Sequence, residues 1–270
     1  MSAYNAQKTI EKAINSCLNQ SYKDIEVIVV NDCSTDNTKQ IVEDLAIKDS
    51  RVRLINHEVN KGAGLARRTG IENIKGEYMT FLDSDDYLKK NCLRKLYDAL
   101  IKYNVDIVAP GFIVTDDKYN VIGERIPDKK VLQGTDKFKP NKADTKRFMN
   151  PMLIKSSLWN NVTYSHRRFI EDTPTLVQIL HYADSILALD YAGYYYVQNP
   201  TSLIHSSNSV RYAIFKALCI KDIAIFFNSV GTYISNKAFI ENYSKLLELE
   251  IEDEEYELYK NELDELYDYF

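Results

Sequence analysis

The amino-acid sequence predicts an α/β fold in which a mostly parallel sheet is flanked by helices. Over the first hundred residues, short β-branched runs alternate with stretches of helical periodicity, as they do in chains that form parallel sheets. Polar clusters, "NDCSTD" at 31–36 and "DSDD" at 83–86, follow two of the predicted strands. Ligands bind at the carboxyl ends of parallel strands, so these clusters are the first candidates for a functional site.

Each element of the first hundred residues has its own signal. Asn5 is a residue type that favours the N-cap, and apolar residues follow it at helical spacing. The β-branched run "IEVIVV" indicates a buried strand, and the glycine turn "NKG" precedes a helical pattern. The predicted elements are a helix over 5 to about 20, a strand over 25–30, a helix over 34–49, a strand over 52–57, a helix ending at Gly76 and a strand over 77–83.

The pattern changes after residue 110. Residues 111–126 indicate a hairpin with a polar turn, and the lysine-rich stretch 127–146 indicates a loop. A helix is expected over 171–184 and a strand over 186–198, and the chain is expected to be helical from about 208. The C-terminal stretch is acidic, whereas helices on membrane surfaces are usually basic, so it is interpreted as a helix that packs on the protein or on a partner.

Composition excludes several classes of protein. With 45% hydrophobic and 27% charged residues, the chain is typical of a soluble globular protein. Four scattered cysteines without a CxxC pair favour a reducing compartment and argue against zinc. No apolar run is long enough to span a membrane, and no signal peptide is recognisable, so a cytoplasmic location is expected. The net charge of −5 argues against nonspecific binding of nucleic acid.

The acidic turn at 83–86 needs a physical explanation. Asp83, Asp85 and Asp86 follow an apolar run and repel one another unless a cation, typically a metal ion, lies among them. The alternative is a solvated turn that caps a helix starting near Tyr87.

Four stretches, taken in order, carry a resemblance to a known family. They are "YNAQKTIEKAINSCLNQSYKDIEVIVVNDCSTDNT" at 4–38, "NKGAGLARRTGIENIKGEYMTFLDSDD" at 60–86, "RRFIEDTPTLVQIL" at 167–180 and "YYYVQNPTSL" at 194–203. Together they resemble the motif series of glycosyltransferase family 2, which comprises inverting enzymes of the Rossmann-like GT-A fold. The resemblance implies a GT-A domain over 1–205, with a nucleotide-sugar half at 1–110 and an acceptor half at 111–205, and a helical C-terminal extension over 206–270.

The resemblance also implies roles for the donor side of the site. Asp85 would hold Mn²⁺ or Mg²⁺, and Asp83 would reach the ribose or the same metal. Asp32 would accept a hydrogen bond from the uracil imide, although it also suits helix capping. The remaining positions that match the family's nucleotide contacts are Ser2, Tyr4 and Arg67. Arg68 and the turn at Lys61 and Gly62 are interpreted as exposed surface.

The catalytic roles come from the resemblance as well. Asp172 matches the general base that takes the proton of the acceptor hydroxyl, with Glu171 in support. An acidic pair at a helix N-terminus is also ordinary capping. His205 is interpreted as structural.

The start of the chain departs from the family pattern. Family members begin with an apolar strand before the position of Ser2, so the first, central strand of the sheet is expected to be missing.

Three functions remain open at this stage. The first is an inverting glycosyltransferase that moves a sugar from a UDP-sugar to a saccharide, lipid-linked or protein acceptor in cell-surface polysaccharide synthesis. The second is a sugar nucleotidyltransferase, which should carry a basic, glycine-rich phosphate loop that this sequence lacks. The third is a weak or inactive nucleotide-binding relative that serves a partner. Association with the inner face of the membrane and pairing of two copies through the C-terminal helices are also left open.

Overall fold

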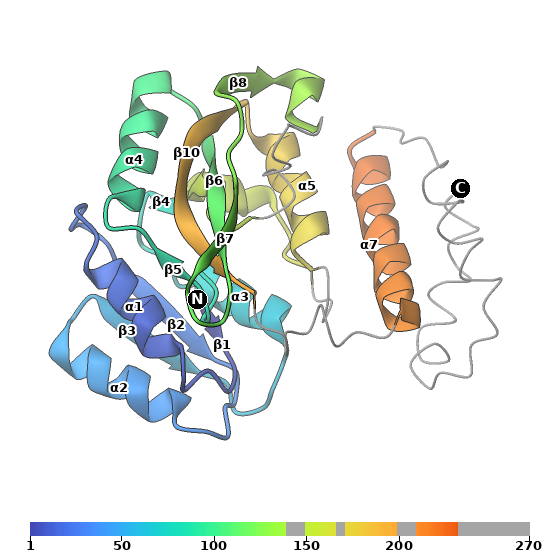
Figure 1. The fold of residues 1–270 in the computed structure, drawn as a ribbon. Coiled ribbons are helices and arrows are strands. Elements are labelled where there is room, and N and C mark those ends of the chain that lie inside the picture. The colour runs from blue at the N-terminus through green and yellow to red at the C-terminus, as the bar shows by residue number, and fades with distance from the viewer. Residues whose placement is uncertain (139–148, 166–170, 199–208, 232–270) are drawn as a thin grey trace.

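The computed structural model describes residues 1–138, 149–165, 171–198 and 209–231. Its strands form a three-stranded sheet of order β1-β2-β3 and a seven-stranded mixed sheet, with helices on their faces (Figure 1). The α/β fold expected from the sequence is confirmed.

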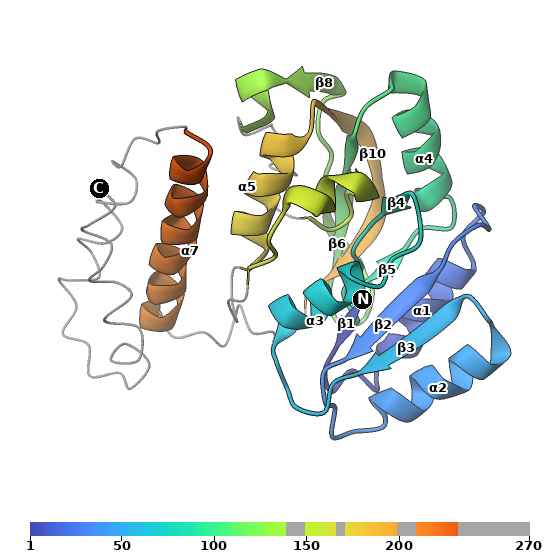
Figure 2. The same ribbon diagram turned by 180° about the vertical axis from the view of Figure 1, so that it is seen from behind.

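The first sheet is parallel and is covered on both faces. All five residues of β2 (Val27–Asn31) are buried, and it pairs in parallel with β3 (Val52–Asn56). Alternate β2 residues enter different cores, because successive side chains of a strand point to opposite faces. Val27 and Val29 lie in the core with α1 (Ile10–Leu18) and α2 (Thr38–Lys48), while Ile28 and Val30 pack with Ala66 of α3 (Ala63–Ile71). Figure 2 shows α3 on the face away from α1 and α2.

The expectation that the first strand is missing is corrected by the structure. Residues Ser2–Ala3 form β1, which pairs in parallel with Val30 and Asn31 of β2. The pairing is extended by Val30 N–H donating to Met1 O at 2.9 Å and by Asp32 N–H donating to Ala3 O at 2.8 Å. The short strand therefore occupies the edge of β2 that would otherwise carry unpaired backbone groups.

The second sheet contains the long central pair of β6 (Ile107–Thr115) and β10 (Ser185–Val197), which is parallel. The shorter strands pair with these two or with each other in antiparallel fashion. They are β4 (Tyr78–Met79), β5 (Tyr87–Leu88), β7 (Val121–Arg125), β8 (Lys130–Gln133) and β9 (Leu153–Lys155). The helices that accompany this sheet are α4 (Cys92–Tyr103), α5 (Asp172–Tyr182) and the 3₁₀ turns Gly134–Phe138 and Ser156–Asn161.

Several predicted boundaries are wrong, and each has a local cause. Asn5 is not the N-cap of the first helix: it has φ +50°, and its side chain accepts from Thr35 N–H at 2.8 Å, so α1 begins only at Ile10. Helix α3 ends at Ile71 rather than Gly76, because the N–H groups of Lys75 and Gly76 donate to the Glu26 side chain.

Other predictions hold in part. The hairpin expected over 111–126 is confirmed as β6 and β7, but the stretch expected to be a loop contains β8. Tyr87 lies in a strand, and the next helix, α4, begins at Cys92. The chain is helical over α7 (Ser209–Ser229), which lies beside α5 in Figure 1, whereas His205 and the acidic stretch at 232–270 lie outside the described residues.

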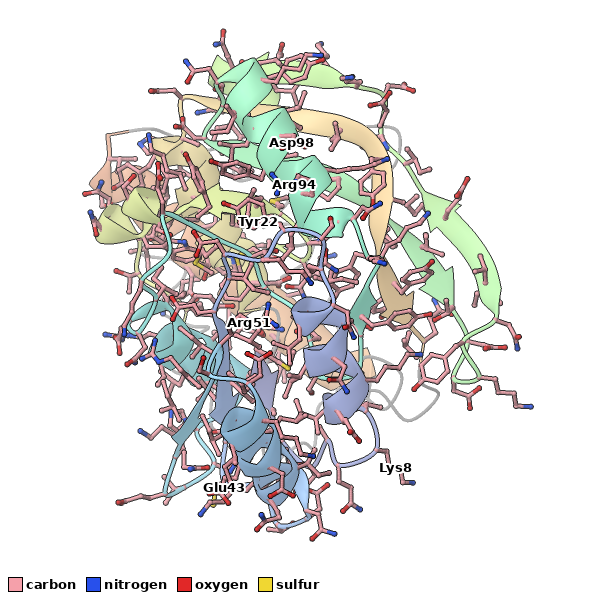
Figure 3. All side chains as sticks on the ribbon, turned by 90° about the vertical axis from the view of Figure 1, so that its left-hand side faces the viewer. Lys8, Tyr22, Glu43, Arg51, Arg94 and Asp98 are labelled. Carbon is pink, nitrogen blue, oxygen red and sulfur yellow. The ribbon has the colours of Figure 1, made fainter. Side chains whose placement is uncertain are left out.

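The face of the molecule that carries α1, α2 and α4 holds a cation–π contact. Arg94 of α4 lies over the ring of Tyr22 at 4.7 Å and also pairs with Asp98, and Figure 3 shows the three side chains near one another.

In the part of the chain that the structure describes, no helix combines the length and apolar character needed to cross a lipid bilayer.

Candidate functional site

Arg67 connects two other predicted site residues, Asp83 and Glu171. It lies on α3, and its guanidinium donates to Asp83 Oδ1 at 2.8 Å and to Glu171 Oε1. Its side chain is only 14% exposed. The contact joins the turn after β4 to the start of α5, which are separated by about ninety residues of sequence. Arg67 therefore joins two segments that the sequence analysis placed in different halves of the chain.

The three acids of the turn at 83–86 have different environments. Asp83 and Asp85 are half-buried, whereas Asp86 is buried. Asp86 accepts hydrogen bonds from the Tyr194 hydroxyl and from Val197 N–H, the latter at 2.8 Å, both on β10. Asp86 is thus an anchor that ties the turn to the second sheet.

Charge and burial shift the pKa values of these two carboxylates in opposite directions. Burial, and then the negative charge of Asp83, raises the pKa of Asp85 to about 6. Burial alone would raise the pKa of Asp83 too, but attraction to Arg67 and hydrogen bonds from Arg67 and Asn150 lower it below its usual value. The repulsion acting on Asp85 is what a bound cation would relieve.

The acidic pair lies at the N-terminus of α5, as expected. Glu171 is 7% exposed and precedes the helix, and Asp172 is its first residue. Burial raises the pKa of Asp172, while attraction to Arg67 opposes the shift. The pKa of Glu171 is raised by burial in the same way. A carboxylate with a raised pKa takes up a proton more readily, which suits a general base.

Asp32 lies after β2 and is 3% exposed. Its Oδ1 is 2.7 Å from His57 Nδ1 and accepts from Lys61 N–H at 2.9 Å, while Oδ2 accepts from Gly62 N–H at 2.7 Å. The nearby Tyr4 is 51% exposed just beyond β1, and Ser2 lies within that strand.

The structure thus groups the predicted residues into two sets. Arg67 links Asp83 with Glu171 directly, and Asp172 and Asp85 adjoin these two along the chain. Tyr4 and Asp32 follow the carboxyl ends of β1 and β2, and Ser2 is the first residue of β1.

Sequence reasoning missed the partners of Asp32. His57 follows β3 as Asp32 follows β2, and the register pairs Asn31 with Asn56, so the two positions are adjacent. This parallel spacing was a signal that could have identified His57. Lys61 and Gly62, interpreted as exposed surface, act through their backbone N–H groups, which leave no trace in side-chain chemistry.

Comparison with known proteins points to one family. The model for Glycosyl transferase family 2 matches residues 1–168. The uncharacterized glycosyltransferase EpsJ of Bacillus subtilis is 33% identical over 208 residues, and the alignment covers 74% of this chain and 60% of EpsJ. An Escherichia coli protein described as UDP-Glc:alpha-D-GlcNAc-diphosphoundecaprenol beta-1,3-glucosyltransferase WfgD is 34% identical over 131 residues, covering 48% of this chain and 51% of WfgD. The chain therefore spans about half to three-fifths of the length of these two relatives.

The fold agrees with that of a solved structure. The crystal structure of S. aureus TarS in complex with UDP-GlcNAc superposes with a TM-score of 0.70 at 21% sequence identity, covering 91% of this chain and 70% of TarS. At this identity the similarity concerns the fold alone. The family match over more than half of the chain, together with the expected motifs around Arg67, shows that this protein belongs to glycosyltransferase family 2.

Proposed function

We propose that this chain is an inverting glycosyltransferase that transfers a sugar from a UDP-sugar to a saccharide, lipid-linked or protein acceptor in the synthesis of a cell-surface polysaccharide. The observation that carries the proposal is the bridge from Arg67 to Asp83 and Glu171, because it joins two carboxylates to which the family resemblance gives a donor-side and an acceptor-side role. The name of the WfgD relative, which specifies a UDP-sugar and a lipid-linked acceptor, supports the substrate classes.

Inversion requires a single displacement. Asp172 takes the proton of the acceptor hydroxyl while the acceptor oxygen bonds to the anomeric carbon of the sugar. The bond between that carbon and the diphosphate oxygen breaks, and its electron pair leaves with UDP. Glu171, held by Arg67, fixes the start of α5 and thereby the position of Asp172.

The acidic turn suits Mn²⁺ or Mg²⁺ because both ions prefer oxygen ligands, and Asp83 and Asp85 provide them. Among the described residues, no group of three or more histidines, cysteines or acids converges on one point, so phosphate oxygens and water would complete the coordination. When bound, the cation would neutralise the charge that develops on the leaving diphosphate.

Base recognition is assigned to Asp32, Ser2 and Tyr4. Asp32 would accept from the uracil imide, and the exposed ring of Tyr4 is available to stack on the base. The cytoplasmic location, the membrane face and the pairing of two copies stay predictions.

The test is release of UDP from a panel of UDP-sugars with Mn²⁺, in the presence and absence of lipid-linked and oligosaccharide acceptors. Asp172→Asn is nearly isosteric but cannot take the proton, so transfer should fall roughly 10²–10⁴-fold while affinity for UDP stays near that of the wild type. Asp85→Asn should lower the Mn²⁺-dependent affinity for UDP together with transfer. Asp190→Asn, at a side chain 55% exposed on β10, is the matched control and should change neither.

Three results would contradict parts of the proposal. Equal affinity for UDP with Mn²⁺ and with chelator would remove the metal role of Asp85. Full transfer by Asp172→Asn, with loss in Glu171→Gln, would move the base to Glu171. Tight binding of UDP without transfer to any acceptor would favour a nucleotide-binding protein over an enzyme.

A further inference from the structure

The Asp32 carboxylate is held from three directions. His57 follows β3, and Lys61 and Gly62 form the approach to α3, so the donors come from two separate segments. Gly62 adopts φ +87°, a backbone conformation that favours glycine and that turns its N–H toward Oδ2. An ionised carboxylate this deeply buried requires such donors, because unpaired burial is costly.

The hydrogen-bond geometry defines the state of the imidazole on the Asp32 side. An ionised carboxylate only accepts hydrogen bonds, so the 2.7 Å contact requires a hydrogen on His57 Nδ1. On the other side of the ring, Nε2 lies 3.0 Å from Thr69 Oγ1, which is itself 3.0 Å from Leu65 O. The ring is therefore fixed between β2 and α3, and it presents Nδ1–H to Asp32.

The remaining hydrogen-bonding capacity of Asp32 is small. A carboxylate has about four acceptor positions, and the donors within the described residues use two on Oδ1 and one on Oδ2. The vacant position is on Oδ2, and it accepts a hydrogen bond but cannot donate one. Uracil has an N–H at the ring nitrogen that would face Oδ2, so it can donate a hydrogen bond to this position. Cytosine has no hydrogen on that nitrogen, so two hydrogen-bond acceptors would face each other.

We infer that His57 is a positioning residue for base recognition, which fixes Asp32 as a pure acceptor and so makes the site select uracil over cytosine. This inference rests on the proposed function, because it takes Asp32 as the group that reads the base. It adds a residue that acts through Asp32 and assigns to it a part in the selectivity between uridine and cytidine nucleotides.

Substitution of His57 by each of the two amide residues distinguishes the role of Nδ1 from that of Nε2. The amide nitrogen of asparagine can take the place of Nδ1, so His57→Asn keeps a donor for Asp32. The amide of glutamine reaches the place of Nε2, so His57→Gln keeps the Thr69 contact and loses the donor. A substitution that only loosened the fold would affect both variants alike.

The experiment measures dissociation constants of UDP, CDP and inorganic diphosphate with Mn²⁺ by calorimetry. The wild type should bind UDP more tightly than CDP. His57→Gln should reduce this preference about tenfold, the usual effect of losing a hydrogen bond to a charged group, and His57→Asn should stay within about threefold of the wild type. Affinity for diphosphate should be unchanged in both. If His57→Gln does not unfold cooperatively, Thr69→Val decides, and its UDP preference should fall about threefold.

The outcomes distinguish this inference from the proposed function. A wild type that prefers UDP, with the same preference in His57→Gln and Thr69→Val, overturns the inference alone. Equal losses for UDP, CDP and diphosphate in a variant also overturn it, because they indicate a merely structural role. A wild type that binds neither nucleotide overturns both.

Discussion

Arg67 and Arg68 are adjacent on α3 but have different electrostatic environments. Arg67 is buried and pairs with Asp83 and Glu171, while Arg68 is 52% exposed and pairs with Glu72, the residue that follows α3. Removal of one partner of a buried pair leaves an uncompensated charge, whereas exposed helical pairs contribute little because solvent screens them. Asp85 and Asp172 lie near the same arginine, so its loss would expose four acids to mutual repulsion.

Arg67→Met should therefore lower the free energy of unfolding by about 3 kcal/mol, since it keeps the apolar stem and removes the charge. Arg68→Met should change the free energy of unfolding by no more than about 0.5 kcal/mol. Urea denaturation without metal or nucleotide measures both. Similar losses in the two variants would mean that the buried ion pairs do not stabilise the fold.

At the scale of elements, the packing of the β6–β7 hairpin requires a close approach between the backbone of Gly111 and the chain at the end of β7. Gly111 lies in β6, and a Cβ built there would be 2.0 Å from Arg125 O and 2.9 Å from Ile126 Cα. Backbone atoms cannot give way as a flexible side chain can. A Cβ at Gly123 of β7, by contrast, would have no atom within 4 Å.

Gly111→Ala should thus displace the hairpin and destabilise the protein by about 2 kcal/mol or more, because the clash is with backbone. Gly123→Ala, on the partner strand, should be neutral or stabilise by up to about 1 kcal/mol, since it restricts only the unfolded chain. Melting temperatures of the two variants test this pair. A Gly111→Ala variant as stable as the wild type would show that the strands separate without cost.

For the molecule as a whole, the four cysteines lie in different regions and differ in burial, so their reactivity measures how tightly each region is packed. All four lie among the described residues, and all four are free thiols. Burial raises the pKa of Cys17 to about 11 and, with the negative charge of Cys17, that of Cys92 to about 12. Cys219 is buried in α7, and Cys33 is half-buried in the turn after β2.

Because the thiolate is the reactive form, raised pKa values keep Cys17 and Cys92 unreactive at pH 8, and they would ionise only near pH 11–12. Iodoacetamide should label Cys33 first in the native protein and all four cysteines in urea, as measured by peptide mass spectrometry. Early labelling of Cys92 would indicate that α4 opens readily.

Sequence periodicity by itself determined the fold class and the alternation of helices and strands from α1 to β4, but it missed the two-residue strands β1 and β5. Buried strands such as β2 are short and strongly apolar, and polar residues at their ends mark the ligand edge, so these features are local and can be seen without a structure. The family resemblance added the roles of Asp32, Asp85 and Asp172, which stay predictions.

Only the tertiary structure decided which residues are partners. Asp86 stands in the acidic turn, but donors from Tyr194 and Val197, more than a hundred residues away, make it an anchor rather than a ligand. Arg67 meets Glu171 at a similar separation, and His57 meets Asp32 because β2 and β3 pair in one register. The physical reason is that burial follows a local pattern of side chains, whereas a hydrogen bond depends on where distant segments bring a donor and an acceptor within about 3 Å.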